Sequence, residues 1–287
     1  MAVMGFAFPR RRVKQLLTPL LPEQWKAPLR GRLFGYRPPA AVLPVTFEDD
    51  ERSAIAAIDG KIRLRFREQE RYDMRYQFVE NGSAIDEITS FIDLAASART
   101  LFDVGASKGV FSQIFCQLQP EGRAVSFEPS PPAMADARAL AELNGCASRI
   151  TLRQTAVGRA PGRAQGLIAP EGFAVFDSAG APTEEFEMTS VDHEVRSLGL
   201  VPDLLKIDVE GYEHEVLLGA RELLRDRKPP VCLELHLDEL DRRGVDAGDV
   251  LGELQAHGYK FRKCSGAAWS AAEIRNAMSA IVRLVAI

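Results

Sequence analysis

Short apolar runs alternate with stretches of helical periodicity along most of this 287-residue chain. The apolar runs predict buried strands, and the stretches in which apolar residues recur every three or four positions predict helices. The predicted strands comprise residues 101–104, 123–127, 150–158, 203–210, 231–236, 259–264 and 279–287. The predicted helices comprise residues 110–118, 131–143, 212–224 and 250–258. This alternation is typical of an α/β domain.

The first of these strands contains Asp103 and runs into a turn with two glycines, Gly105 and Gly109. Gly105 can adopt backbone angles that a side chain forbids, and Gly109 allows the helix start to lie close to the strand or to a ligand. The spacing GxxxG differs from the GxGxxG of dinucleotide-binding turns, which disfavours a nicotinamide cofactor. The N–H groups of this turn, including those of Ala106 and Ser107, would attract a small carboxylate, and Asp103 would offset a positive charge. S-adenosylmethionine (AdoMet) carries both a carboxylate and an ammonium group, so we predict AdoMet as the ligand.

Two further strand ends complete the predicted cofactor site. Glu128 lies 25 residues after Asp103, near the interval at which nucleotide-binding α/β folds place a carboxylate for the ribose hydroxyls. Alternatively, Glu128 caps the helix that follows it. We expect Ala156 and Val157, at the end of the third predicted strand, to lie near the adenine. The glycine-rich and proline-rich region 161–182 is expected to form a hairpin or loop over the sheet that contributes to substrate selection.

Four motifs occur in the order and at roughly the spacing typical of FkbM-type methyltransferases. They are DVGASKG (103–109), FEPSP (127–131), TSVDHEV (189–195) and LLKIDVEGYEHEVLLGA (204–220). The chain resembles this family from about residue 73 to residue 236. The resemblance implies a Rossmann-like class I methyltransferase fold: a mostly parallel seven-stranded sheet, its last strand antiparallel, with helices on both faces. It also implies AdoMet as cofactor and transfer of a methyl group to a hydroxyl of a sugar, a glycolipid or a secondary metabolite.

Ionisable residues gather at the ends of two adjacent predicted strands. Lys206, Asp208 and Glu210 alternate along the first strand, so they share one side if it stays regular. Glu234 and His236 end the second strand. A hydroxyl acceptor needs a general base or a metal ion, and His236 is the first candidate base and Glu210 the second, with Asp208 beside them.

Other roles for these residues stay open. The oxygens of Asp208, Glu210 and Glu234, together with His236, could instead hold Mg²⁺ or another divalent metal ion. His236 could also tie its strand to a neighbouring loop through a hydrogen bond. For Lys206, a salt bridge to Asp208 or Glu210 is the favoured interpretation.

The segment before the cofactor turn is expected to form a cap with a hairpin and a helix. A turn at Asp59–Gly60 follows one short strand, and apolar residues alternate over residues 62–66 as in a half-buried strand. The helix is predicted over residues 86–97. The resemblance implies that this segment covers the cofactor and contributes to the acceptor side, while a plain surface helix is an equally good interpretation. The residues that would face the pocket are Tyr72, Asp73 and Tyr76.

Charge and cysteine content restrict the possible partners. The net charge of −4 argues against a nucleic-acid partner. Residues 1–37 nevertheless carry eight Lys and Arg residues and one Glu. The favoured interpretation is a basic arm that is loosely ordered or packs on its own acidic domain, and the alternative is peripheral contact with an anionic membrane. We expect no signal peptide and no membrane span. The four cysteines lie far apart without a CxxC pair, which favours free thiols in the cytoplasm over a zinc site.

Taken together, the patterns and the family resemblance predict three segments: a basic N-terminal extension (1–40), a cap (41–97) and, as the resemblance implies, an AdoMet-binding methyltransferase domain (98–287). The expected activity is O-methylation of a hydroxyl on a small-molecule or glycan acceptor. A non-catalytic AdoMet-binding partner protein is the alternative from another class. A nucleotide-dependent oxidoreductase is disfavoured because its GxGxxG turn is absent.

Overall fold

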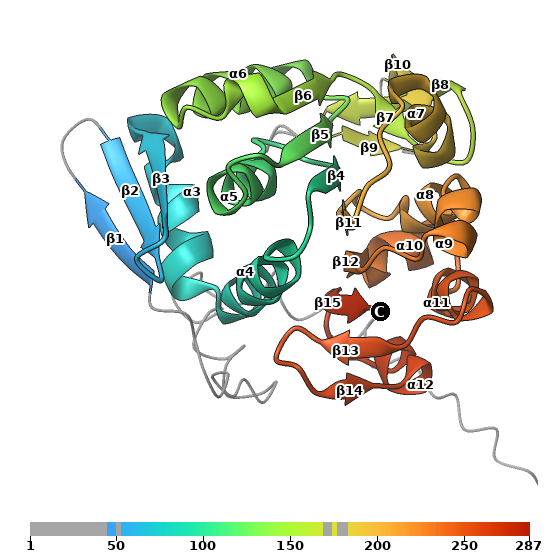
Figure 1. The fold of residues 1–287 in the computed structure, drawn as a ribbon. Coiled ribbons are helices and arrows are strands. Elements are labelled where there is room, and N and C mark those ends of the chain that lie inside the picture. Colours follow the sequence, from blue (N-terminus) through green and yellow to red (C-terminus); the bar gives the residue numbers. More distant parts are fainter. Residues whose placement is uncertain (1–44, 50–52, 169–173, 177–182) are drawn as a thin grey trace, which may run out of the picture.

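The computed structural model describes residues 45–49, 53–168, 174–176 and 183–287. The basic extension predicted over residues 1–40 lies outside these ranges, as does part of the excursion predicted over residues 161–182. The described residues form a large central sheet, a three-stranded sheet and a small four-stranded sheet, with helices around them (Figure 1).

The central sheet is the core of the fold. Its strands are β4 (Thr100–Val104), β5 (Arg123–Phe127), β6 (Ile150–Arg153), β11 (Leu204–Ile207), β12 (Val231–His236), β13 (Phe261–Lys263), β14 (Ala268–Trp269) and β15 (Ile281–Ala286). Their order is β14-β13-β15-β12-β11-β4-β5-β6. The run from β12 to β6 is parallel, and β15 is antiparallel to both of its neighbours. The mostly parallel sheet with an antiparallel last strand is thus confirmed, but the sheet has eight strands instead of seven because the two-residue β14 pairs with β13.

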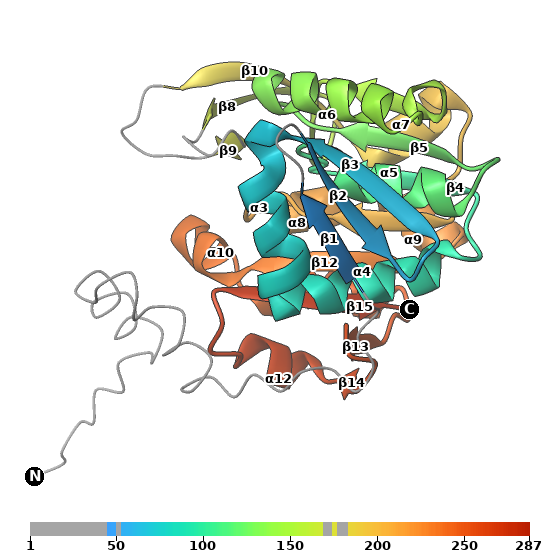
Figure 2. The ribbon, with the colours of Figure 1, turned by 90° about the vertical axis from the view of Figure 1, so that its left-hand side faces the viewer.

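Helices cover both faces of the central sheet (Figures 1 and 2). Alternate residues of a strand point to opposite faces, so Leu101 packs in one core cluster and Phe102 in the other. The first cluster includes α4 (Gly82–Ala95), α5 (Val110–Leu118) and α6 (Pro131–Leu143). The second includes α7 (Val191–Leu198), α8 (Glu213–Leu218), α9 (Arg221–Asp226), α10 (Leu237–Arg243), α11 (Ala247–Ala256) and α12 (Ala271–Arg275). The predicted helices on both faces are therefore confirmed.

A three-stranded antiparallel sheet precedes the central domain. It consists of β1 (Val45–Asp49), β2 (Ser53–Ile58) and β3 (Ile62–Arg67). The predicted turn at Asp59–Gly60 joins β2 to β3, and both residues have positive φ angles. In β3 the alternating residues Ile62, Leu64 and Phe66 are buried, and the strand contacts α5 and α6. The chain then continues through η2 (Glu68–Glu70), α3 (Arg71–Arg75) and the π-helix η3 (Tyr76–Glu80) into α4.

The single strand predicted over residues 150–158 is divided between two sheets. After β6 the chain turns at Thr155, whose N–H donates to the Arg153 carbonyl and whose hydroxyl donates to the Glu187 carbonyl. This turn moves Ala156 and Val157 (β7) out of the central sheet. They pair in parallel with β10 (Glu184–Thr189) in a sheet completed by β8 (Gly162–Ile168) and β9 (Ala174–Phe176). The antiparallel pair β8–β9 confirms the expected hairpin.

The strand predicted over residues 203–210 also ends early, at Ile207. Glu210 and Gly211 have φ angles of +50° and +94°, which turn the chain away from the sheet. The regular alternation predicted to place Lys206, Asp208 and Glu210 on one side is therefore wrong at Glu210, which reaches the site from a turn.

The helix predicted over residues 212–224 is broken into α8 and α9 at Gly219. A Cβ at this position would lie 2.1 Å from the Gly158 carbonyl oxygen. The close approach of the segment after β7 therefore requires glycine, and the chain changes direction there.

The four cysteines are free thiols in the structure, as expected. Cys116, Cys146 and Cys232 are buried and Cys264 is half-buried. None of the helices in the described ranges combines the length and apolar character that crossing a membrane requires.

Candidate functional site

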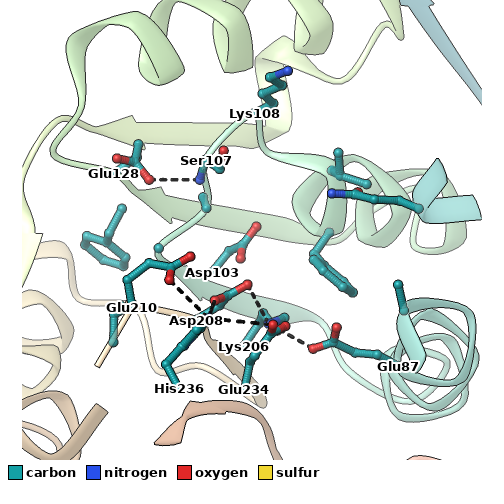
Figure 3. Close-up of a pocket in the computed structure, with 18 of the residues that line it drawn as sticks. Glu87, Asp103, Ser107, Lys108, Glu128, Lys206, Asp208, Glu210, Glu234 and His236 are labelled. Carbon is teal, nitrogen blue, oxygen red and sulfur yellow. Dashed lines mark hydrogen bonds and ion pairs between the residues drawn. The ribbon is translucent and has the colours of Figure 1, made fainter. Parts of the chain in front are cut away.

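A cavity of about 770 Å³ opens where β4, β5, β11 and β12 end (Figure 3). Carboxyl ends of parallel strands are the usual place for ligands in α/β sheets. The turn after β4, the α3–η3 segment and β7 contribute the other walls. The cavity is lined by all of the residues predicted for the cofactor or for chemistry, with Gly109 as the exception.

Gly105 and Gly109 both have left-handed backbone angles, with φ of +77° and +71°. A Cβ on Gly105 would lie 1.7 Å from the Asp208 carbonyl oxygen, so this turn can pack against the end of β11 only with glycine. A Cβ on Gly109 would meet nothing nearer than 3.5 Å. Gly109 is therefore needed for its conformation at the start of α5, and no close approach to the strand requires a glycine there.

The turn was expected to offer free N–H groups to a carboxylate, but these groups already donate within the protein. Those of Gly105 and Ala106 donate to the Phe127 carbonyl oxygen at 2.9 and 3.0 Å. That of Ser107 donates to Glu128 Oε2 at 3.0 Å. The turn folds onto the end of β5, and this contact uses the donors. A bound carboxylate would need donors from elsewhere in the cavity.

Two buried carboxylates flank the turn. Asp103 Oδ2 accepts hydrogen bonds from the Ser112 N–H at 3.1 Å and hydroxyl at 2.8 Å, and Ser126 contacts the same hydroxyl. Glu128 accepts from Ser107 through Oε2 and from the Ser130 N–H through Oε1 at 2.8 Å. Burial raises the pKa of Asp103 to about 6 and that of Glu128 to about 7. Each ionised carboxylate has acceptor positions left for a ligand's hydroxyl groups.

The ionisable residues predicted at the two strand ends do come together, around His236. Its Nε2 lies 3.3 Å from Glu210 Oε2, and 3.7 Å from both Asp208 Oδ1 and Glu234 Oε1. Its Nδ1 lies 2.9 Å from Oε1 of Glu213, a fully buried residue. The sequence analysis did not select Glu213, which directly follows the Gly211 turn.

The proximity of these groups shifts their pKa values strongly. Burial lowers the pKa of His236, but the hydrogen bond that its Nδ1–H donates to Glu213 and the nearby carboxylates outweigh this and raise the pKa to about 10. Burial raises the pKa of Glu210 to about 7 and that of Glu234 to about 8. The side chains of the cluster therefore keep their protons at a higher pH than isolated side chains of the same types would.

Two permanent cations contact the carboxylates of the cluster. Lys206, only 1% exposed, places Nζ 3.4 Å from Asp208 Oδ2 and 3.0 Å from Glu87 Oε1. The predicted salt bridge from Lys206 to Asp208 is thus confirmed. Arg283 donates to Glu87 Oε2 at 2.9 Å and to Glu234 Oε1 at 2.6 Å. Through Glu87, helix α4 is tied to both the parallel strands and the antiparallel β15.

Glu87 and Arg283 are not among the residues predicted for the site, although both have a recognisable signal in the sequence. Arg283 is the single charge in an otherwise apolar strand. Glu87 precedes Phe91 by one helical turn and therefore lies on the buried face of α4. A charged residue at an apolar position of a predicted element indicates a buried partner.

The cap contributes Tyr72, Asp73 and Tyr76 to the cavity lining, as predicted. Tyr72 is 82% exposed and Tyr76 is 48% exposed, so both tyrosines lie at the mouth. Lys108, in the turn after β4, extends across to Asp73 with its Nζ 3.3 Å from Oδ2. Hydrogen-bonding side chains of the cap therefore face the turn after β4 across the opening of the cavity.

Three residues of the cluster lie close enough together to hold a metal ion. Asp208, Glu234 and His236 each offer one ligand atom, and these atoms lie within 4.8 Å of one another. Glu210, the fourth predicted ligand, is not one of these three residues.

Comparison with protein families gives a match to the Methyltransferase FkbM domain over residues 103–261, more than half of the chain. The match includes both flanking carboxylates and the His236 cluster, and it excludes Glu87 and Arg283. No curated protein matches the chain.

Several solved structures are similar to the chain at low identity. Methyltransferase FkbM from Methylobacillus flagellatus KT is 17% identical, with 66% of this chain and 43% of that chain covered and a TM-score of 0.44. Precorrin-6y C5,15-methyltransferase from Geobacter metallireducens GS-15 is 17% identical, with 73% and 89% covered and a TM-score of 0.42. An O-methyltransferase from Bacillus cereus, in complex with SAH, is 10% identical, with 70% and 78% covered and a TM-score of 0.40. This chain spans less than half of the length of the first of these proteins.

Proposed function

The chain belongs to the FkbM methyltransferase family, and from this premise we propose that it uses AdoMet to methylate a hydroxyl oxygen of a sugar, glycolipid or secondary metabolite. The observation that carries the proposal is one cavity with two kinds of wall. Asp103 and Glu128 flank its first side, and the carboxylate–histidine cluster forms its second. A donor and an acceptor can thus meet between the two.

The residues of the first side fit the parts of AdoMet. Glu128 is 3% exposed and would accept hydrogen bonds from the two ribose hydroxyls. Ala156 and Val157 are buried and apolar and would contact the adenine. Asp103 would face the positive charge of the methionine end. The carboxylate of the AdoMet methionine end would be held by Lys108, because the N–H groups of the turn already donate hydrogen bonds within the protein.

The chemistry asked of the second side is proton removal. When bound, AdoMet supplies a methyl group that is already activated on a sulfonium, so the chain has to align the acceptor and take its proton. Glu210 is the better placed base, since its side chain is 29% exposed while that of His236 is 6% exposed and is held by Glu213. We assign proton acceptance to Glu210 and orientation of the carboxylates to His236.

Calorimetry with AdoMet and with its demethylated product tests the cofactor assignment. Binding of both ligands by the wild-type protein, and weaker binding by Glu128→Gln, are expected. Absence of heat with either ligand would overturn the proposal. Incubation with methyl-labelled AdoMet and extracts of candidate acceptors then tests the reaction. Binding without label transfer to any acceptor would favour a non-catalytic AdoMet-binding protein.

A further inference from the structure

The orientation of His236 is the first observation that bears on a metal ion. Histidine ligands of metals almost always donate their other ring N–H to a carboxylate or carbonyl oxygen. Here Nδ1 lies 2.9 Å from Glu213 Oε1, which directs Nε2 toward Glu210 at 3.3 Å and toward Asp208 and Glu234, both at 3.7 Å. Glu213 is itself fixed, because the same oxygen accepts the Gly211 N–H at 3.0 Å. The remaining Glu213 oxygen, Oε2, is buried and has no hydrogen-bond partner among the described residues.

The second observation is an excess of negative charge. The contacts around His236 and Lys206 join five carboxylates, and the permanent cations among them are Lys206 and Arg283. The carboxylates therefore outnumber the permanent cations by three, and a bound cation would offset part of this difference, because charge without a partner is costly at buried positions. The carboxylates concerned are those of Glu87, Asp208, Glu210, Glu213 and Glu234.

The third observation is how the oxygens of Asp208 are divided. Its Oδ2 faces Lys206 at 3.4 Å, while Oδ1 faces His236. Lys206 therefore holds Asp208 in place and leaves one oxygen directed at the imidazole. Carboxylate oxygens, which two of the three residues supply, suit a divalent ion of the Mg²⁺ or Mn²⁺ type.

We infer that Asp208, Glu234 and His236 bind one divalent cation, Mg²⁺ or Mn²⁺, on the acceptor side of the cavity. The ion would take up the excess charge and leave positions open for the acceptor hydroxyl, whose pKa it would lower. Its role in the reaction rests on the proposed function. The hydroxyl proton passes to Glu210, the new C–O bond forms, and the S–C bond of the donor breaks, leaving a neutral thioether.

Direct metal binding tests the inference without any methyl acceptor. Protein treated with EDTA and then dialysed is titrated with Mn²⁺ alone, and free Mn²⁺ is followed by electron paramagnetic resonance. We expect one site in the wild-type protein and competition by Mg²⁺. Asp208→Asn and Glu234→Gln should abolish the site. Glu213→Gln should weaken it by about 10–100-fold, because Glu213 orients the ligand histidine.

The matched control is Glu253→Gln. Glu253 Oε1 lies 3.3 Å from His257 Nε2, which is another carboxylate–histidine pair but outside the cavity. This variant should bind Mn²⁺ like the wild-type protein, and circular dichroism of every variant shows whether it is folded. Failure of the wild-type protein to bind millimolar Mn²⁺, or equal binding by folded Asp208→Asn, would overturn the metal site. AdoMet binding in the presence of EDTA reports on the proposed function separately.

Discussion

Replacing Gly105 with alanine tests the contact between the turn after β4 and the end of β11. The new Cβ would lie 1.7 Å from the Asp208 carbonyl oxygen, and real contacts of this kind are not shorter than 3.0 Å. The two segments would therefore have to separate by more than 1 Å. Left-handed backbone strain costs about 1–2 kcal/mol, and overpacking costs about 1–3 kcal/mol more. The total of about 2–5 kcal/mol corresponds to a fall in Tm of about 4–10 °C for a chain of this size.

Function should suffer more than stability, because Asp208 belongs to the cluster. A displacement of about 1 Å in a catalytic group can reduce activity by about 100-fold. The assays are thermal unfolding, calorimetry with AdoMet, and the rate of methyl transfer.

Gly145→Ala is the matched control for this substitution. Gly145 also has a left-handed backbone, with φ of +66°, but a Cβ there would meet nothing within 4 Å. We expect its Tm to fall by only about 2–4 °C, from backbone strain alone, with unchanged AdoMet affinity. If Gly105→Ala and Gly145→Ala proved equally stable and bound AdoMet equally well, the described packing at the strand ends would be refuted.

Three further predictions concern the buried charges. Glu128→Gln should reduce AdoMet affinity by about 10–100-fold in calorimetry, because hydrogen bonds to a charged acceptor contribute about 1.5–3 kcal/mol. Wild-type affinity should also fall as the pH drops below about 7, since burial raises the pKa of Glu128 to about 7 and only the ionised carboxylate accepts from both ribose hydroxyls; the same pH slope in Glu128→Gln would contradict this assignment. Lys206→Met should lower the free energy of unfolding in urea by about 3–5 kcal/mol, because it leaves Glu87 and Asp208 without their shared cation. Unfolding at the wild-type urea concentration would show that this cation is not required.

The sequence was sufficient to predict those parts of the site whose residues lie in short motifs. Asp103, Glu128 and Asp208 each lie at or just beyond the end of a parallel strand, and adjacent parallel strands end at the same edge. Their convergence follows from strand order, which the family resemblance supplied. Glu234 and His236 joined them for the same reason.

What the sequence could not predict depends on contacts between distant segments. Glu87 and Arg283 are 196 residues apart, and they meet only because β15 inserts between β12 and β13 and contacts α4. The engaged N–H groups of the turn depend on the Phe127 carbonyl of the next strand. The turn at Glu210 replaces a regular strand end, and no local propensity distinguishes the two.

The α3–η3 wall is encoded upstream of the stretch that matches the family, residues 103–261. Under the proposed function, the residues that would bind the methyl donor and the surface nearest the mouth of the cavity are therefore encoded in separate stretches of the gene. Recombination in the upstream stretch would then change the acceptor while the residues for the donor are inherited intact. Such an exchange would have to retain Glu87, since this residue of α4, the helix that follows the α3–η3 wall, pairs with Lys206 and Arg283.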